Sequence, residues 1–328
     1  MQLPINPAAP VTTIIYGGLF YTFVFLQIYQ LFMMNSRFFK WTLICLFTIV
    51  GCQSPKEQKA TSNGSLNAID DLGRKVSCPS NVQRVMALSP SLTEYLALIC
   101  PDKIVARTQN CDFPVWVKDL PAVSNYPELD VEALVRLRVD LIVSQKGITN
   151  SEQIKQIEEL GIPVYIFNND SISKMIHANE RLGTLVGDYN RGKEVADSLQ
   201  KQLDCKKDTS LAQVKVLGIT SLDPIFIYGR SSLFGQMVDT LGATCFGESL
   251  SGSYPQVDEE YLIRKAPSLI VAPAGFDYEA FFDVHTNLKN LEAYQQNRLY
   301  MINGDYISRQ GPRALLGLQE LKRILEKF

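Results

Sequence analysis

The chain has 328 residues, 46% of them hydrophobic, which is long enough for two domains of ordinary size. Its formal net charge of −2 and the lack of a Lys/Arg run beyond the amino-terminal region exclude a basic face for nucleic acid. Its two histidines, His177 and His285, lie in no catalytic motif, and the chain contains no GxSxG, no GxxxxGK and no histidine cluster. These absences argue against a hydrolase and against a carrier of free transition-metal ions.

The first 51 residues are predicted to form a signal or leader region. An apolar run, residues 38–51, follows Arg37 and ends at the tetrad Ile49-Val-Gly-Cys52, which is the order of a signal peptide's charged, apolar and cleavage regions. The tetrad resembles a bacterial lipobox, which implies cleavage before Cys52 and acylation of its thiol. A transmembrane anchor with an incidental cysteine is the alternative.

An earlier apolar run, residues 11–32, is long enough to cross a bilayer of about 30 Å. Because a lipoprotein signal rarely follows another hydrophobic segment, either translation starts at Met33 or Met34, or the run is an additional anchor. Residues 52–68 are rich in Ser, Lys, Gln, Asn and Gly and are predicted to form a lipidated flexible tether.

From about Ile69 onward, apolar runs alternate with helical patterns, which indicates parallel βαβ units. Strands are predicted at Arg84–Leu88, Lys103–Ala106, Leu141–Ser144, Val164–Phe167, Val214–Ile219, Ile225–Ile227, Leu269–Ala272 and Leu299–Ile302. A helix is predicted from Ser91 to Ile99, because Ser91-Leu-Thr-Glu94 has the spacing of a capping box. Another helix is predicted to begin at Val131. Further helices are predicted at Glu152–Leu160, Leu233–Leu241, Glu259–Arg264, Asn287–Gln295 and Pro312–Lys327.

Residues 171–205 are predicted to form one long connecting helix. No proline occurs between Ser173 and Leu203, and apolar residues recur there at helical spacing. A continuous helix of this length would span about 46 Å, enough to run along two lobes. The expected fold class is therefore α/β, with two βα lobes (69–170 and 206–328) that have parallel-type sheets, are joined by one long interlobe helix and enclose a ligand cleft.

Five cysteines fall in the folded part, an odd number for an oxidising compartment, so at least one should remain unpaired. They are Cys78, Cys100, Cys111, Cys205 and Cys245. No pair has CxxC spacing, so neither a redox motif nor a thiolate metal site is indicated. Cys100 and Cys111 are candidates for a bridge, and small buried thiols are the alternative.

One segment of the chain occurs twice, at an offset of 128 residues. Residues 126–143 and 254–271 are identical at nine of eighteen positions when they are aligned without a gap. Each copy has a tyrosine, Tyr126 or Tyr254, on a predicted loop. Two tyrosines that face each other across a cleft would sandwich a flat ligand, with a large contact area at a low cost in side-chain entropy.

Each copy of the repeat also has a glutamate, Glu132 or Glu260, in the first turn of a predicted helix. Two glutamates on matching surfaces would dock onto paired cations of a symmetric partner. The alternative is that each glutamate only complements the positive end of its own helix.

The folded region, 69–328, resembles the periplasmic-binding proteins of ABC importers whose lobes are joined by one long helix, the group that binds cobalamin, haem and ferric siderophores. The matching stretches are both copies of the repeat, Arg84-Val-Met-Ala-Leu-Ser-Pro-Ser-Leu-Thr-Glu94, Cys111-Asp-Phe-Pro114 and Arg309-Gln-Gly-Pro-Arg313. Within this group the chain looks most like the cobalamin-binding proteins, through Tyr254-Pro-Gln-Val257 and the stretch from Asp305 to Arg313.

This resemblance implies a ligand site at the cleft edge and on the aromatic walls. Its members would be Ser89, Pro90, Ser91, Phe113, Tyr126, Phe226, Tyr254, Tyr306 and Arg309. It also implies that Glu132 and Glu260 grip arginines of the permease. Arg309 and Arg313 would face an anionic ligand or be surface charges. Gln145 stands where a cobalamin binder would have tryptophan.

The function implied is that of an exported monomer, a membrane-anchored lipoprotein that faces the periplasm or the outer cell surface. It would deliver cobalamin or a related corrinoid to an ABC permease dimer with its ATPase subunits. No catalytic residue, metal site or cofactor is expected. Haem or a ferric siderophore is the alternative ligand, and a metal-cluster or chelatase-like enzyme of the same fold is a further alternative. A structural adhesin would not need twin cleft aromatics.

Overall fold

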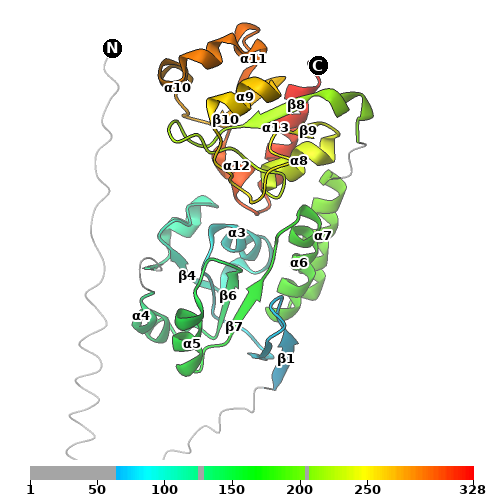
Figure 1. The fold of residues 1–328 in the computed structure, drawn as a ribbon. Coiled ribbons are helices and arrows are strands. Elements are labelled where there is room, and N and C mark those ends of the chain that lie inside the picture. Colours follow the sequence, from blue (N-terminus) through cyan, green and yellow to red (C-terminus); the bar gives the residue numbers. More distant parts are fainter. Residues whose placement is uncertain (1–63, 125–128, 204–206) are drawn as a thin grey trace, which may run out of the picture. The chain divides into compact units, whose positions relative to one another are not determined.

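The computed structural model describes residues 64–124, 129–203 and 207–328, and residues 63–328 form one compact unit (Figure 1). The predicted leader, Cys52 and most of the predicted tether lie outside the described residues, as does Tyr126. Among the helices that the structure describes, none has the length and apolar character needed to cross a bilayer.

The described part of the amino-terminal lobe carries a parallel sheet of five strands in the order β5-β4-β3-β6-β7. The strands are β3 (Val85–Ala87), β4 (Ile104–Thr108), β5 (Ala122–Val123), β6 (Leu141–Gln145) and β7 (Val164–Phe167). The helices are α3 (Pro90–Ile99), α4 (Val131–Arg136) and α5 (Ser151–Glu159), with short 3-10 helices at Pro101–Lys103 and Val115–Asp119. β6 is buried at every position, as expected for a central strand with both faces covered.

An antiparallel hairpin precedes this sheet, formed by β1 (Ser65–Ile69) and β2 (Lys75–Pro79). The folded part therefore begins earlier than predicted, because residues 65–68 belong to a strand and not to the tether. Leu66 and Ala68 pack against the main hydrophobic cluster, so alternate side chains of this polar stretch are partly buried.

The carboxyl-terminal lobe, as far as the structure describes it, carries a parallel sheet of four strands in the order β11-β10-β8-β9. The strands are β8 (Lys215–Gly218), β9 (Thr244–Cys245), β10 (Leu269–Pro273) and β11 (Leu299–Ile302). The helices are α8 (Leu233–Leu241), α9 (Glu259–Lys265), α10 (Tyr278–Val284), α11 (Glu292–Gln295), α12 (Gly304–Ser308) and α13 (Ala314–Leu325), with 3-10 helices at Thr209–Gln213 and Thr286–Asn290.

Two predicted elements of this lobe are wrong. Residues 225–227 form only isolated bridges, to Ile219 and Gln256, because their partners are neighbouring loop segments and not a strand of the sheet. The helix predicted at Asn287–Gln295 is a 3-10 helix followed by α11, and the extended backbone of Leu291 separates them.

The two sheets have the same order, since β4-β3-β6-β7 corresponds to β9-β8-β10-β11. The repeated segment forms α4 and β6 in one lobe and α9 and β10 in the other. In each copy an aspartate, Asp130 or Asp258, accepts a hydrogen bond from the backbone nitrogen three residues later and so caps the helix. Arg138 and Ala266, at the same position of the repeat, both have a left-handed backbone, with φ of 50° and 49°. The repeat thus encodes the same unit twice, and the prediction of two similar lobes is confirmed.

The prediction of one long helix over residues 171–205 is wrong. The segment forms two helices, α6 (Ile172–Leu185) and α7 (Tyr189–Leu203), which pack against each other. The chain turns between them at Gly187, whose φ is 79°. Gly183 and Gly192 bring the two backbones together, since a Cβ on Gly183 would lie 2.8 Å from the Cα of Gly192. The helical periodicity continues across the turn because both helices bury one face in the same core.

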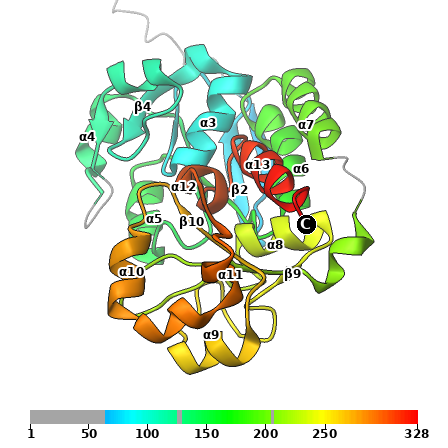
Figure 2. The same ribbon diagram turned by 90° about the horizontal axis from the view of Figure 1, so that it is seen from above.

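One hydrophobic cluster runs from the first lobe through α6, α7 and α13 into the second lobe. Leu96, Leu182, Leu199, Phe234 and Leu321 belong to it. α13 lies against both α7 and α8, so the carboxyl-terminal helix binds the helix pair to the second lobe (Figure 2).

Cys78, Cys100, Cys111 and Cys245 are buried and free, so the bridge considered between Cys100 and Cys111 is not formed. The Sγ of Cys111 lies 3.2 Å from the Thr93 Oγ1 and 3.0 Å from the Thr108 Oγ1 and packs there as a small thiol. Burial raises the pKa of the Cys78 and Cys245 thiols to about 11, which makes them unreactive.

Candidate functional site

The predicted cleft-edge residues lie at the carboxyl end of the first sheet, where open α/β sheets bind ligands. Ser89 follows β3 and is the N-cap of α3, and its Oγ accepts a hydrogen bond from the Leu92 nitrogen at 3.3 Å. The helix therefore begins at Pro90, a residue that suits the first helical position, and not with a capping box at Ser91 and Glu94. The spacing of Ser91 and Glu94 suits a capping box, but the Glu94 carboxylate instead accepts hydrogen bonds from Arg313, which is 219 positions away in the chain.

A chain of neutral hydrogen bonds joins the two lobes here. The Ser91 hydroxyl donates to the Gln145 Oε1 at 2.9 Å, and the Gln145 Nε2 donates to the Gln310 Oε1 at 2.7 Å. Gly311 packs so closely that a Cβ there would lie 3.3 Å from Ser91. The segment after α12 thus covers Ser89, Ser91 and Gln145, all of which are buried.

Beside these neutral groups lies a charged cluster, which we call the arginine cluster: Arg309 and Arg313 with Glu94, Asp112 and Asp305. Arg313 binds Glu94 through two contacts, Nη2 to Oε1 at 2.6 Å and Nε to Oε2 at 3.0 Å. Arg309 contacts the Asp112 Oδ1 at 3.1 Å and the Asp305 Oδ1 at 2.9 Å. Two guanidinium groups therefore meet three carboxylates among the described residues of the cluster.

Arg313 is not a free surface charge, because it is partly buried and already has carboxylate partners. Its side chain is 14% exposed and that of Glu94 is 2% exposed. Burial raises the pKa of the Glu94 carboxyl, and the hydrogen bond from Arg313 opposes this rise without cancelling it. At Asp112 partial burial also acts to raise the pKa, but the hydrogen bond and charge of Arg309 outweigh it, so that pKa is lowered.

Aromatic rings enclose the arginine cluster. The Arg313 guanidinium carbon lies 4.5 Å from the centre of the Phe113 ring and 5.8 Å from that of Tyr306. Tyr254 is half exposed and lies 5.6 Å from Tyr228, ring centre to ring centre. The Tyr228 hydroxyl is 2.9 Å from the Ser308 Oγ, next to Arg309.

Ser91, Phe113, Tyr306 and Arg309 therefore lie in one connected region, and Tyr254 adjoins it through Tyr228. Phe226 is half-buried and pairs with Gln256, two residues after Tyr254. Three groups of this region were missed in the sequence: Asp112, Glu94 and Gln310. No local pattern marks their role, because each is defined by a partner from the other lobe.

Glu132 and Glu260 are exposed and occupy the second position of α4 and α9. The side chain of Glu260 is 84% exposed, and its Oε1 lies 3.4 Å from the Arg264 Nη1. Such an exposed pair is weak, so Glu260 is available to another cation. Neither glutamate belongs to the arginine cluster.

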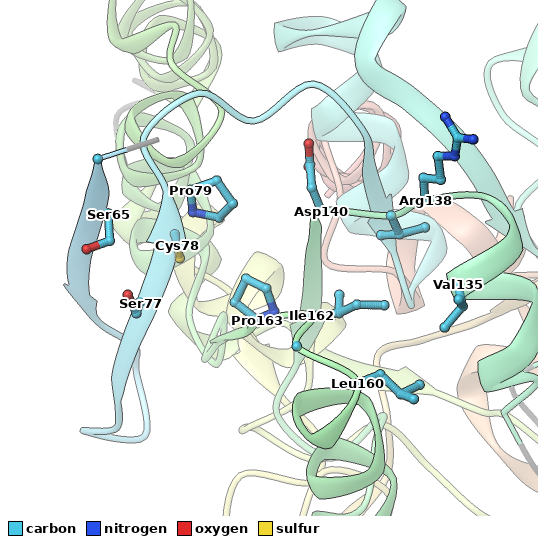
Figure 3. A pocket seen from close by; sticks show the side chains of 13 residues that line it. Ser65, Ser77, Cys78, Pro79, Val135, Arg138, Asp140, Leu160, Ile162 and Pro163 are labelled. Atoms are coloured by element: carbon cyan, nitrogen blue, oxygen red, sulfur yellow. The ribbon is translucent and has the colours of Figure 1, made fainter. Parts of the chain in front are cut away.

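One cavity adjoins this region, and a second cavity lies away from it. One, of about 500 Å³, lies between α3, α7 and α13, has Leu98, Leu199 and Leu316 in its wall and reaches Phe113 and the Glu94–Arg313 pair. The other, of about 480 Å³, lies between β2 and the residues that precede β6 and β7 (Figure 3).

The cavity of Figure 3 is at the amino ends of the strands, opposite the predicted site, and none of the predicted ligand residues that the structure describes lines it. Its carboxylate, Asp140, accepts hydrogen bonds from the backbone nitrogens of Gln83 and Arg84. In the part of the chain that the structure describes, no group of three or more His, Cys, Asp or Glu side chains is placed to hold a metal ion.

The periplasmic binding protein family matches residues 85–306. The uncharacterized ABC transporter substrate-binding lipoprotein YvrC of Bacillus subtilis is 26% identical over 306 residues, which cover 88% of this chain and 96% of the relative. A vitamin B12-binding protein of Vibrio parahaemolyticus is 24% identical over 246 residues, 73% of this chain and 88% of the relative. The solved structure of the periplasmic heme binding protein HutB of Vibrio cholerae has a TM-score of 0.67 and 17% identity and covers 75% of this chain and 99% of its own. That similarity confirms the two-lobed α/β fold.

Proposed function

This chain belongs to the periplasmic binding protein family, and we propose that it is a lipid-anchored carrier that delivers cobalamin or a related corrinoid to an ABC import permease. Two relatives support the proposal, since one is named as an ABC transporter substrate-binding lipoprotein and another as a vitamin B12-binding protein. Members of this family bind and deliver solutes, so we assign no reaction to the chain.

We choose the ligand from the charge balance of the arginine cluster. Haem has two propionates, and many ferric siderophores are anionic, so a site for them needs cations with bonding capacity to spare. Here Arg309 is held by Asp112 and Asp305, and Arg313 by Glu94. Cyanocobalamin has no net charge and a rim of carboxamides, which suits the neutral Ser91, Gln145 and Gln310 side chains better.

The ligand site that we propose keeps the residues predicted from the sequence. They are Ser89, Pro90, Ser91, Phe113, Tyr126, Phe226, Tyr254, Tyr306 and Arg309. Because Gln310 and Gly311 cover Ser91 and Gln145, ligand entry requires this segment to separate from the first lobe. The permease is proposed to contact Glu132 and Glu260, away from that site.

Titration of the purified protein with cyanocobalamin, haemin and a ferric siderophore tests the ligand, with absorbance and heat recorded. We expect a micromolar or lower Kd for cyanocobalamin. Haemin should bind about 100-fold more weakly, because accommodating two propionates would cost about 2.7 kcal/mol in broken arginine pairs. Tighter binding of haemin or the siderophore would reverse the choice of ligand, and binding of none would refute the assignment.

Lipid anchoring at Cys52 is supported by the extent of the match to the Bacillus lipoprotein. Since 88% of 328 residues is about 289, that alignment has to begin by about residue 40 and therefore spans Cys52. We expect Cys52→Ala to move the protein from the membrane to the soluble fraction and to abolish labelling with a radioactive fatty acid. Cys45→Ala, seven residues upstream, is the matched control. Continued labelling of the Cys52→Ala protein would disprove the anchor.

A further inference from the structure

Asn169 is a buried amide without a hydrogen-bond partner. Its residue is 2% exposed, and neither its Oδ1 nor its Nδ2 has a partner in the described part of the chain. Buried polar groups in proteins are nearly always hydrogen-bonded, so an amide that lacks partners at both atoms calls for a physical explanation. Asn179 differs, because its Nδ2 donates to the carbonyls of Met175 and Ile176.

The position of Asn169 places it at the ligand edge of the first sheet. β6 and β7 are parallel neighbours, and Gln145 pairs in register with Phe167, two residues before Asn169. Asn169 therefore follows the same carboxyl edge at which Ser89 and Gln145 lie. This location is an observation separate from the missing hydrogen bonds, and open α/β sheets bind ligands beyond the carboxyl ends of their strands.

The second lobe contacts the chain directly after Asn169. Gln236 of α8 donates to the Asp170 carbonyl at 2.8 Å and accepts from the Ile172 nitrogen at 3.0 Å. Asn169 thus lies beside a contact between the lobes, and no feature of local structure uses its side chain. The neighbouring Asn168 is satisfied, since its Nδ2 donates to the Asp170 Oδ2 at 2.9 Å.

We propose that Asn169 is a further ligand-binding residue, whose amide pairs with a neutral carboxamide on the rim of the bound corrinoid. An amide offers both a donor and an acceptor, and a second amide satisfies both at once. A carboxylate in the same place would accept from Nδ2 and leave Oδ1 facing a negative charge. Asn169 therefore selects an amide over an acid. This inference rests on the proposed function.

The test replaces Asn169 by leucine, which has nearly the same size, in the full-length protein and measures cyanocobalamin affinity together with ligand-free melting temperature. We expect the affinity to fall by about 10- to 100-fold, because the ligand amide loses its partner. The melting temperature of the ligand-free protein should stay the same or rise, since the unsatisfied amide is gone. Asn168→Leu, at the adjacent position, should leave the affinity within about twofold.

A second arm uses the monocarboxylic acids of cyanocobalamin, in each of which one side-chain amide is hydrolysed. Wild-type protein should bind one of them about tenfold more weakly than cyanocobalamin, and Asn169→Leu should remove that difference. Unchanged cyanocobalamin affinity in Asn169→Leu overturns the inference. So does a loss of affinity accompanied by a lower ligand-free melting temperature, which would mean that Asn169 supports the fold. Failure of the wild-type protein to bind cyanocobalamin would instead reject the proposed function, and this inference with it.

Discussion

Replacing Glu132 and Glu260 together by alanine is expected to abolish ligand import while the affinity for the ligand stays unchanged. The two glutamates are exposed at the same position of the two repeat copies, on α4 and α9. A charged pair that becomes buried at an interface loses about 2–5 kcal/mol when one partner is removed, so two such losses would weaken docking by at least about 1,000-fold. Uptake of labelled ligand by cells and equilibrium titration of the purified variant give the two readouts.

Glu152 provides the matched control for this experiment. It occupies the second position of α5 behind the cap Asn150, as Glu132 does in α4 behind Asp130, but it lies outside the repeat. If the glutamates only complement helix ends, alanine at any of the three positions should cost about 0.3–1 kcal/mol of stability and leave import intact. Normal uptake by the double variant would refute the docking role. An equal loss of uptake in Glu152→Ala would show that the effect is not specific to the two glutamates of the repeat.

Replacing Arg313 by methionine is expected to destabilise the protein by about 3–5 kcal/mol near neutral pH, because it leaves the Glu94 carboxylate buried and uncompensated. Burial already holds the folded pKa of Glu94 above its unfolded value, so the stability linked to this group is complete below the unfolded pKa and falls as the pH rises through the folded pKa. Without Arg313 the folded pKa rises further. The destabilisation should therefore be small at pH 5 and large at pH 8, as measured by denaturant unfolding.

The double variant Glu94→Gln and Arg313→Met separates the buried charge from the lost packing. It removes the charge and keeps side chains of similar size, so we expect it to recover most of the stability at pH 8. Asp305 remains beside Arg309 in this variant and should hold that arginine in place. An equal loss of stability in Arg313→Met at both pH values would show that the Glu94 carboxylate is not the cause, and so would a double variant no better than the single one.

Local signals in the sequence predicted most of the elements. The predictions for α8 and β11 match the structure residue for residue. At α8 the start is marked by the cap Ser232 and the end by Gly242, which adopts the left-handed conformation. The wrong prediction of one long helix also has a local cause. The apolar periodicity of α6 continues into α7, so the turn between the two helices leaves no signal in the pattern.

The candidate site was predicted only in part. The repeat located Tyr254 and Glu260, and the resemblance added Ser91, Phe113 and Arg309. The partners of these residues could not be read from the chain, because Glu94 and Arg313 are separated by 219 positions and Gln145 and Gln310 by 165. Neither pair has a spacing rule that would connect it.

The sequence by itself determined that the chain has two similar α/β lobes with matching glutamates on their helices, since strand runs, helix caps and the repeat are properties of neighbouring residues. Only the tertiary structure decided that the connecting segment folds into two helices and that Arg309 and Arg313 are already neutralised. Gly183 approaches Gly192 closely because two successive helices pack against each other. Arg313 meets Glu94 because segments 219 positions apart in the chain pack together. The proposal of an uncharged ligand rests on that packing, and so does the proposal for the unpartnered amide of Asn169.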